Sequence, residues 1–136
     1  MAETILLVPV QFPVTADGAR TVSRALELAR RVENPHLSIL HVNLIQNRED
    51  VTKIELQRTV EKTMGRLPTA SYHVRDAYLL EDAILNETRL QNAAYVIIGH
   101  SRRARWRRWL GTRLGTTANL ESVLPEQLDA EVVVVS

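Results

Sequence analysis

Residues 95–117 read YVIIGHSRRARWRRWLGTRLGTT, and this stretch decides the fold. It opens with four residues typical of a buried strand, Tyr95–Ile98, and Gly99 follows directly. A glycine at the end of an apolar strand lets the backbone turn without a clash at Cβ. The Gly-Thr-Thr sequence at 115–117 predicts the start of a helix, whose free N–H groups can face an anion. The stretch therefore predicts a strand, a basic loop and a helix, against which the rest of the chain packs.

The composition is that of an ordinary globular protein. The 136 residues suffice for one domain with a core, and 45% are hydrophobic and 24% charged. No apolar run approaches the roughly 20 residues that a membrane span needs. The first residues lack a basic segment, which predicts no signal peptide. Because the chain has no Cys, it has no disulfide and no thiolate ligand or nucleophile, and we expect a cytoplasmic protein.

The positive charge is concentrated in one segment. Six of the 17 basic residues lie between Arg102 and Arg113, where there is no Asp or Glu, so the remainder of the chain is net negative. Such a local patch bears on partners more than on the fold.

Short apolar strands alternate with helical patterns along the chain. We expect strands at 4–10, 37–42, 70–74, Tyr95–Ile98 and 131–135. We expect helices at 17–32, capped by Thr15 or Asp17, at 47–67, starting near Asn47 or Asp50, and at 80–90 and 117–124. This alternation predicts right-handed βαβ crossovers, and hence one doubly wound α/β domain over 1–136, with a mostly parallel five-stranded sheet and helices on both faces. In such sheets, ligands bind beyond the carboxyl ends of the strands, where the strand order reverses.

Three segments carry a family resemblance: TILLVPV, LSILHVN, and AAYVIIGH followed by a Gly-Thr helix start. Over nearly the whole chain they resemble the universal stress protein family. The resemblance implies a cytoplasmic stress-response regulator with strand order 3-2-1-4-5. It also implies a homodimer in which strand 131–135 pairs across the axis. The very apolar sequence of that strand fits a protected edge.

The nucleotide-binding branch of this family carries G-x2-G-x9-G-S/T after the fourth strand. The sequence keeps the first glycine as Gly99 but has Arg102 at the second position. Thr112 stands where the third glycine is expected, between Gly111 and Gly115. The Cβ of Arg102 either blocks close approach of phosphate to the backbone, or its guanidinium binds the phosphate directly.

The resemblance also implies ATP or AMP as a ligand. Gln11 stands where the family has an Asp after the first strand, and its neutral amide can hydrogen-bond a ribose hydroxyl or an adenine edge. The residues expected to bind nucleotide are Pro9, Val10, Gln11, Val42, Gly99, His100, Arg102, Gly111, Thr112, Gly115, Thr116 and Thr117.

Catalysis and metal binding have little support in the sequence. The four histidines, His36, His41, His73 and His100, do not stand at a metal-ligand spacing. We interpret His41 as a hydrogen-bonded residue of the core or of a strand end. No Walker-type loop or nucleophile–base arrangement is present, so we predict no dedicated enzyme, with slow incidental ATP hydrolysis left open.

Segment 101–114 allows a second interpretation of function. Trp106, Trp109, Leu110 and Leu114 fall on one stripe if the segment is helical, with arginines on the other faces. We favour a lid packed over the end of the sheet. The alternative is a nucleotide-free interaction module that docks on a membrane surface or a transporter. Nucleic-acid binding is a third and less favoured interpretation.

Overall fold

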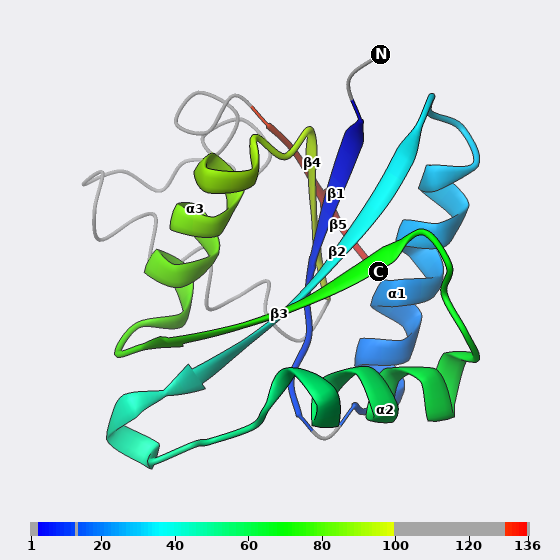
Figure 1. Ribbon diagram of the computed structural model, residues 1–136. Helices are drawn as coiled ribbons and strands as arrows, with labels where there is room; N and C mark the ends of the chain where they lie inside the picture. Colours follow the sequence, from blue (N-terminus) through cyan, green and yellow to red (C-terminus); the bar gives the residue numbers. More distant parts are fainter. Residues whose placement is uncertain (1–2, 13, 100–129, 136) are drawn as a thin grey trace.

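A computed structural model describes residues 3–12, 14–99 and 130–135 (Figure 1). Five strands of this part form one sheet: β1 (Thr4–Pro9), β2 (Pro35–Leu44), β3 (Ala70–Ala77), β4 (Tyr95–Ile98) and β5 (Glu131–Val134). The strand order is β3-β2-β1-β4-β5, and every pair of neighbours is parallel. The predicted α/β fold and strand order are thereby confirmed.

Strand β1 lies in the middle of the sheet. It pairs with β2 from Thr4 opposite Pro35 to Pro9 opposite Leu40, and with β4 through Leu6 opposite Tyr95. Such a strand is covered on both faces, which is why its sequence is apolar without alternation.

Helices cover both faces of the sheet. Helices α1 (Ala16–Ala29) and α2 (Lys53–Met64) lie on one face, and α3 (Leu80–Gln91) lies on the other (Figure 1). The α1 and α2 face buries Val22, Leu56 and Val60 with Leu6 and Val8 of β1. The α3 face buries Ile84 and Leu85 with Leu7 of β1. Because successive side chains of a strand point to opposite faces, β1 contributes to both halves of the core.

The start of α1 settles one alternative of the sequence analysis. Thr15, and not Asp17, is the N-cap, and its hydroxyl oxygen accepts a hydrogen bond from the backbone N–H of Gly18 at 3.3 Å. Asp17 falls inside the first turn, where a carboxylate favours the helix dipole.

The start of α2 corrects the sequence prediction. The helix begins at Lys53 and not near Asn47 or Asp50, because Thr52 and Glu55 form a capping box that satisfies free N–H groups. Residues Ile45–Asn47 instead form a short 3-10 turn, η1, which ends at Arg48 in the left-handed conformation. The helix ends at Met64, short of the predicted end at 67, and Gly65 follows as its C-cap with a φ of 81°.

Strands β2 and β3 are longer than their apolar sequences indicated. The ladder between them continues to Asn43 opposite Asp76 and Leu44 opposite Ala77. Polar residues at these strand ends form hydrogen bonds, which a search for hydrophobic patterns does not reveal. One example is the amide of Asn43, which bonds both backbone groups of Val51.

The predicted helix at 117–124 and the Arg/Trp segment 101–114 lie outside the described residues. Within the described part of the chain, no helix combines the length and apolar character needed to cross a bilayer.

Candidate functional site

The strand order reverses between β1 and β4. Strands β2 and β3 extend the sheet on one side of β1, while β4 and β5 extend it on the other. The residues that follow these two central strands meet there: Gln11 after β1 and Gly99 after β4 line the same small hollow, of about 10 Å³. That volume holds about one water molecule at most, so the hollow by itself is no ligand pocket.

Gly99 fits its position for a reason that the sequence analysis did not give. A Cβ at this residue would lie 2.8 Å from both Asp17 Oδ2 and Thr21 Oγ1 of α1. Among the described glycines only Gly65 has a positive φ, so Gly99 does not serve a left-handed turn. It permits the end of β4 to approach the first turns of α1 closely.

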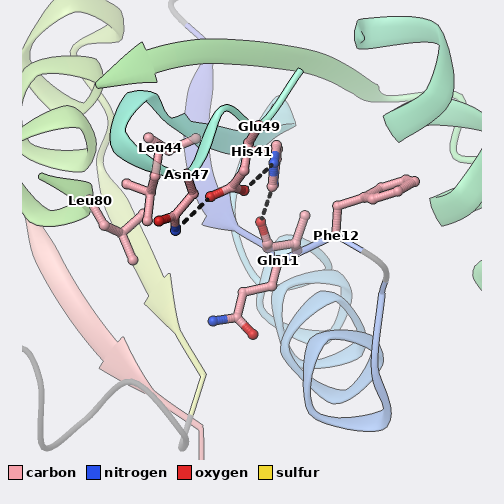
Figure 2. A pocket seen from close by; sticks show the side chains of 9 residues that line it. Gln11, Phe12, His41, Leu44, Asn47, Glu49 and Leu80 are labelled. Carbon is pink, nitrogen blue, oxygen red and sulfur yellow. Dashed lines mark hydrogen bonds and ion pairs between the residues drawn. The ribbon is translucent and has the colours of Figure 1, made fainter. Parts of the chain in front are cut away.

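A larger cavity lies beside this hollow, beyond the carboxyl ends of β1 and β2 (Figure 2). Its volume is about 270 Å³. The described residues that line it are Val10, Gln11, Phe12, His41, Val42, Leu44, Asn47, Glu49 and Leu80. Val10 and Gln11 border both the cavity and the small hollow, so the two lie next to each other at this end of the sheet, and we call them together the crevice.

His41 is the buried polar group of the cavity wall. Only 4% of its surface is exposed, and its Nδ1 lies 3.2 Å from the carbonyl oxygen of Val10. Because a carbonyl oxygen can only accept, Nδ1 carries the hydrogen. The other ring nitrogen, Nε2, is buried and makes no hydrogen bond within the described residues.

Glu49 faces this ring nitrogen from the turn after β2. Its Oε1 lies 3.8 Å from His41 Nε2, a separation too long for a hydrogen bond, while Asn47 Nδ2 lies 3.4 Å from Oε2 (Figure 2). The turn itself is closed by the Arg48 N–H, which donates to Ile45 O at 3.1 Å. The cavity thus places a carboxylate and an imidazole side by side.

Apolar groups complete the wall. The Phe12 ring meets the His41 ring edge to face, with centroids 6.2 Å apart. Leu44 and Leu80 lie on the opposite side of the cavity (Figure 2). The wall therefore combines apolar side chains with the polar groups of Gln11, His41, Asn47 and Glu49.

The structure brings together some of the residues predicted to bind nucleotide. Val10, Gln11 and Val42 line the cavity, and Pro9, Val10, Gln11 and Gly99 line the hollow beside it. The other predicted residues lie outside the described part of the chain: His100, Arg102, Gly111, Thr112, Gly115, Thr116 and Thr117.

Sequence reasoning missed most of the cavity wall. Phe12, His41, Leu44, Asn47, Glu49 and Leu80 were not predicted as site residues. For His41, the prediction of a hydrogen-bonded strand-end residue is confirmed by its contact with Val10. The signal that could have revealed more is the sheet order itself, since the loop after the second strand borders the same reversal point as the loop after the first.

The other described histidines lie elsewhere. His36 Nε2 and His73 Nε2 lie 2.9 Å and 3.0 Å from the hydroxyl oxygen of Ser71, at the opposite half of β2 and β3. Within the described ranges, no group of three or more His, Asp or Glu side chains could hold a metal ion.

Comparison with known proteins adds no family assignment. No model of a known protein family matches this chain, and no curated protein matches it.

Proposed function

We propose that this chain is a regulatory protein of the universal stress type that binds an adenine nucleotide, ATP or AMP, in the crevice at the carboxyl end of its sheet. One observation carries the proposal: a cavity of about 270 Å³ adjoins the point where the order of a parallel sheet reverses. Open α/β sheets bind their ligands at such points.

Space and the sequence, more than charge, favour one orientation of the nucleotide. A carboxylate lines each part of the crevice, Glu49 in the cavity and Asp17 in the hollow, so repulsion of phosphate does not choose between them. The base is placed in the cavity because the cavity is the larger of the two spaces. The ribose lies near Gln11, and the phosphates lie on the side of Gly99. In this orientation, the basic segment that follows Gly99 in the sequence is the source of positive charge for the phosphates.

The proposed role is binding and signalling, with any ATP hydrolysis slow and incidental. We also propose a homodimer through β5. This strand lies at an edge of the described sheet and consists of Glu131 followed by valines. An apolar edge strand is open to pairing with another chain, and pairing with a second copy satisfies it.

Calorimetric titration with ATP and with AMP, in the presence of magnesium, tests the proposal. We expect saturable binding below millimolar nucleotide. Leu44→Trp is the matched site variant, because Leu44 is half-buried at the cavity wall and an indole there fills the space proposed for the base. Binding that is weakened in this folded variant supports the site. Absence of binding to the wild-type protein at millimolar nucleotide would refute the proposed function.

A further inference from the structure

A serine hydroxyl lies between two imidazole rings on the face of the sheet that α3 covers. His36 Nε2 of β2 and His73 Nε2 of β3 lie 2.9 Å and 3.0 Å from Ser71 Oγ. Alternate residues of a strand share a face, and Arg75, two residues after His73, reaches Glu87 of α3. The three residues therefore lie on the α3 face, toward the amino ends of β2 and β3 and away from the crevice.

The Ser71 hydroxyl has only one hydrogen, so the two imidazole rings have different roles. Glu3 Oε2 lies 3.9 Å from His36 Nδ1. A carboxylate beside this nitrogen favours a hydrogen on Nδ1, which leaves the Nε2 lone pair of His36 to accept the hydrogen of Ser71. Carboxylate, imidazole and hydroxyl in this order form the arrangement that activates a serine. The arrangement is not visible in the sequence, because 35 residues separate His36 from Ser71.

His73 completes the arrangement from the other side. Burial lowers the pKa of His73, so its ring is neutral at neutral pH and carries one hydrogen. Because the hydrogen of Ser71 goes to His36, the hydrogen of His73 lies on Nε2 and is donated to Ser71 Oγ. A donor at this oxygen stabilises the negative charge that develops there when the serine reacts.

The Ser71 hydroxyl is open to small molecules. Ser71 and His73 are half-buried, and the His36 side chain is 31% exposed. Strand β3 is at an edge of the described sheet, so no further strand of the described ranges lies beyond it. Ser38, which lies opposite Ser71 in β2, is fully buried by contrast.

We propose that Ser71 is a nucleophilic serine, with His36 as its general base, that hydrolyses small activated carboxylic esters. Ser71 Oγ forms a bond to the carbonyl carbon while its hydrogen passes to His36 Nε2. The bond from that carbon to the leaving oxygen then breaks, and the imidazolium returns the hydrogen to the leaving group. Water hydrolyses the acyl-serine by the same two proton transfers. This activity is independent of the proposed nucleotide function.

Labelling with a fluorophosphonate tests the nucleophile. The oxygen of an activated serine forms a bond to phosphorus and displaces fluoride, which leaves a stable adduct. Peptide mass spectrometry of the wild-type protein should find the adduct on Ser71, formed at least about tenfold faster than on Ser23, which is exposed on α1. This comparison needs no variant. Absence of an adduct on Ser71, or equal rates at the two serines, would overturn the inference.

Two matched variants test which ring is the base. His36→Gln should slow the labelling of Ser71 at least about tenfold, because an amide does not take up the proton. In His73→Gln the amide N–H still donates to Ser71 Oγ, so the rate should change by less than about threefold. The rate at Ser23 in the same samples is the reference. A His36→Gln protein labelled as fast as the wild type, or a larger loss in His73→Gln, would overturn the assignment.

Hydrolysis of p-nitrophenyl acetate tests the activity itself, through the release of p-nitrophenolate. Ser71→Ala should lower the rate at least about tenfold, and Ser23→Ala should leave it unchanged. A Ser71→Ala protein that retains the wild-type rate would overturn the proposed hydrolysis.

Glu3 is a positioning residue, and its effect has a spectroscopic signature. Imidazole nitrogen NMR of the wild-type protein should show the hydrogen of the neutral His36 ring on Nδ1. In Glu3→Gln the fraction of His36 with its hydrogen on Nε2 should increase, and the labelling of Ser71 should slow. A His36 ring that carries its hydrogen on Nε2 in the wild-type protein would contradict its role as the base.

Discussion

Gly99, at the end of β4, lies so close to Thr21 of α1 that a Cβ on Gly99 would come within 2.8 Å of the Thr21 hydroxyl oxygen. Thr21 is buried, and its hydroxyl donates to Asp17 O at 2.8 Å, so it cannot easily give way. The end of β4 and the first turns of α1 can therefore approach this closely only with glycine at position 99.

Gly99→Ala should therefore destabilise the protein by about 1–3 kcal/mol, as overpacking does. The matched control is Gly18→Ala, because the nearest atom to a Cβ there is Val14 Cγ1 at 3.4 Å and the residue lies within α1. Alanine in a helix is favoured over glycine, so the control should be neutral or stabilising by up to about 1 kcal/mol. Urea denaturation measures both, and equal effects would contradict the contact.

Arg75 stabilises the buried carboxylate of Glu87. The Glu87 side chain is 3% exposed, and Arg75 Nε and Nη2 donate to its two oxygens at 2.8 Å and 3.1 Å. The Gln91 side chain donates a further hydrogen bond to the same carboxylate. Arg75→Ala leaves a buried charge with one partner fewer and should cost about 1–3 kcal/mol. Arg24→Ala breaks the exposed pair with Glu27 and should cost less than about 1 kcal/mol. Thermal denaturation of the two variants should rank them in this order, and the reverse order would contradict the assignment.

His73 should make the stability of the protein fall in mild acid. Burial lowers the pKa of His73 below its ordinary value of 6.5, with Glu87 opposing and Arg75 adding to the shift. Below that value the unfolded chain binds a proton that the folded protein does not bind, so the free energy of unfolding decreases as the pH falls below about 6.5. Above about 6.5 the contribution of His73 to stability is fully present.

The His73→Gln variant tests this effect, because glutamine keeps a polar group next to Ser71 and does not titrate. Urea denaturation midpoints at about pH 7.5 and about pH 5.5 should differ less in the variant than in the wild-type protein. An identical difference in the two proteins would show that the pH dependence arises elsewhere.

In the proposed dimer, the backbone N–H groups of β5 that point away from β4 pair with the second copy. The N–H groups of Glu131 and Val135 donate to Ala94 O and Ile98 O of the β4 side, so the N–H of Val134 points away from β4. Val134→Pro removes an outward donor and should yield a monomer, measured by light scattering, while the ladder to β4 persists. Val133→Pro is the contrasting variant and should lower stability, because its N–H points toward β4. A Val134→Pro protein as dimeric as the wild type would contradict pairing through this strand.

The sequence was sufficient for the sheet because β1 and β4 are mostly buried strands and β5 is an edge strand, and all three have strongly apolar sequences. The crevice was harder to predict. Val42 was predicted, but its neighbour His41 was not, although both line the cavity. A sequence pattern does not record that the Val10 carbonyl fixes the ring of His41, or that the turn after β2 carries Glu49 back to meet it. The first contact joins segments far apart in the chain and forms only once the ladder between β1 and β2 has set the strand ends side by side, and the second depends on the course of the turn after β2.

The most direct test of the central claim is to map where ATP binds by backbone amide NMR. We predict that ATP shifts the amides of Gln11, Val42 and Glu49, which line the cavity, and the amide of Gly99, which lines the hollow beside it. The amides of Tyr78 and Leu90, which line a separate cavity between β3 and α3, should not move. Shifts confined to that second cavity, or no shifts at millimolar ATP, would contradict it.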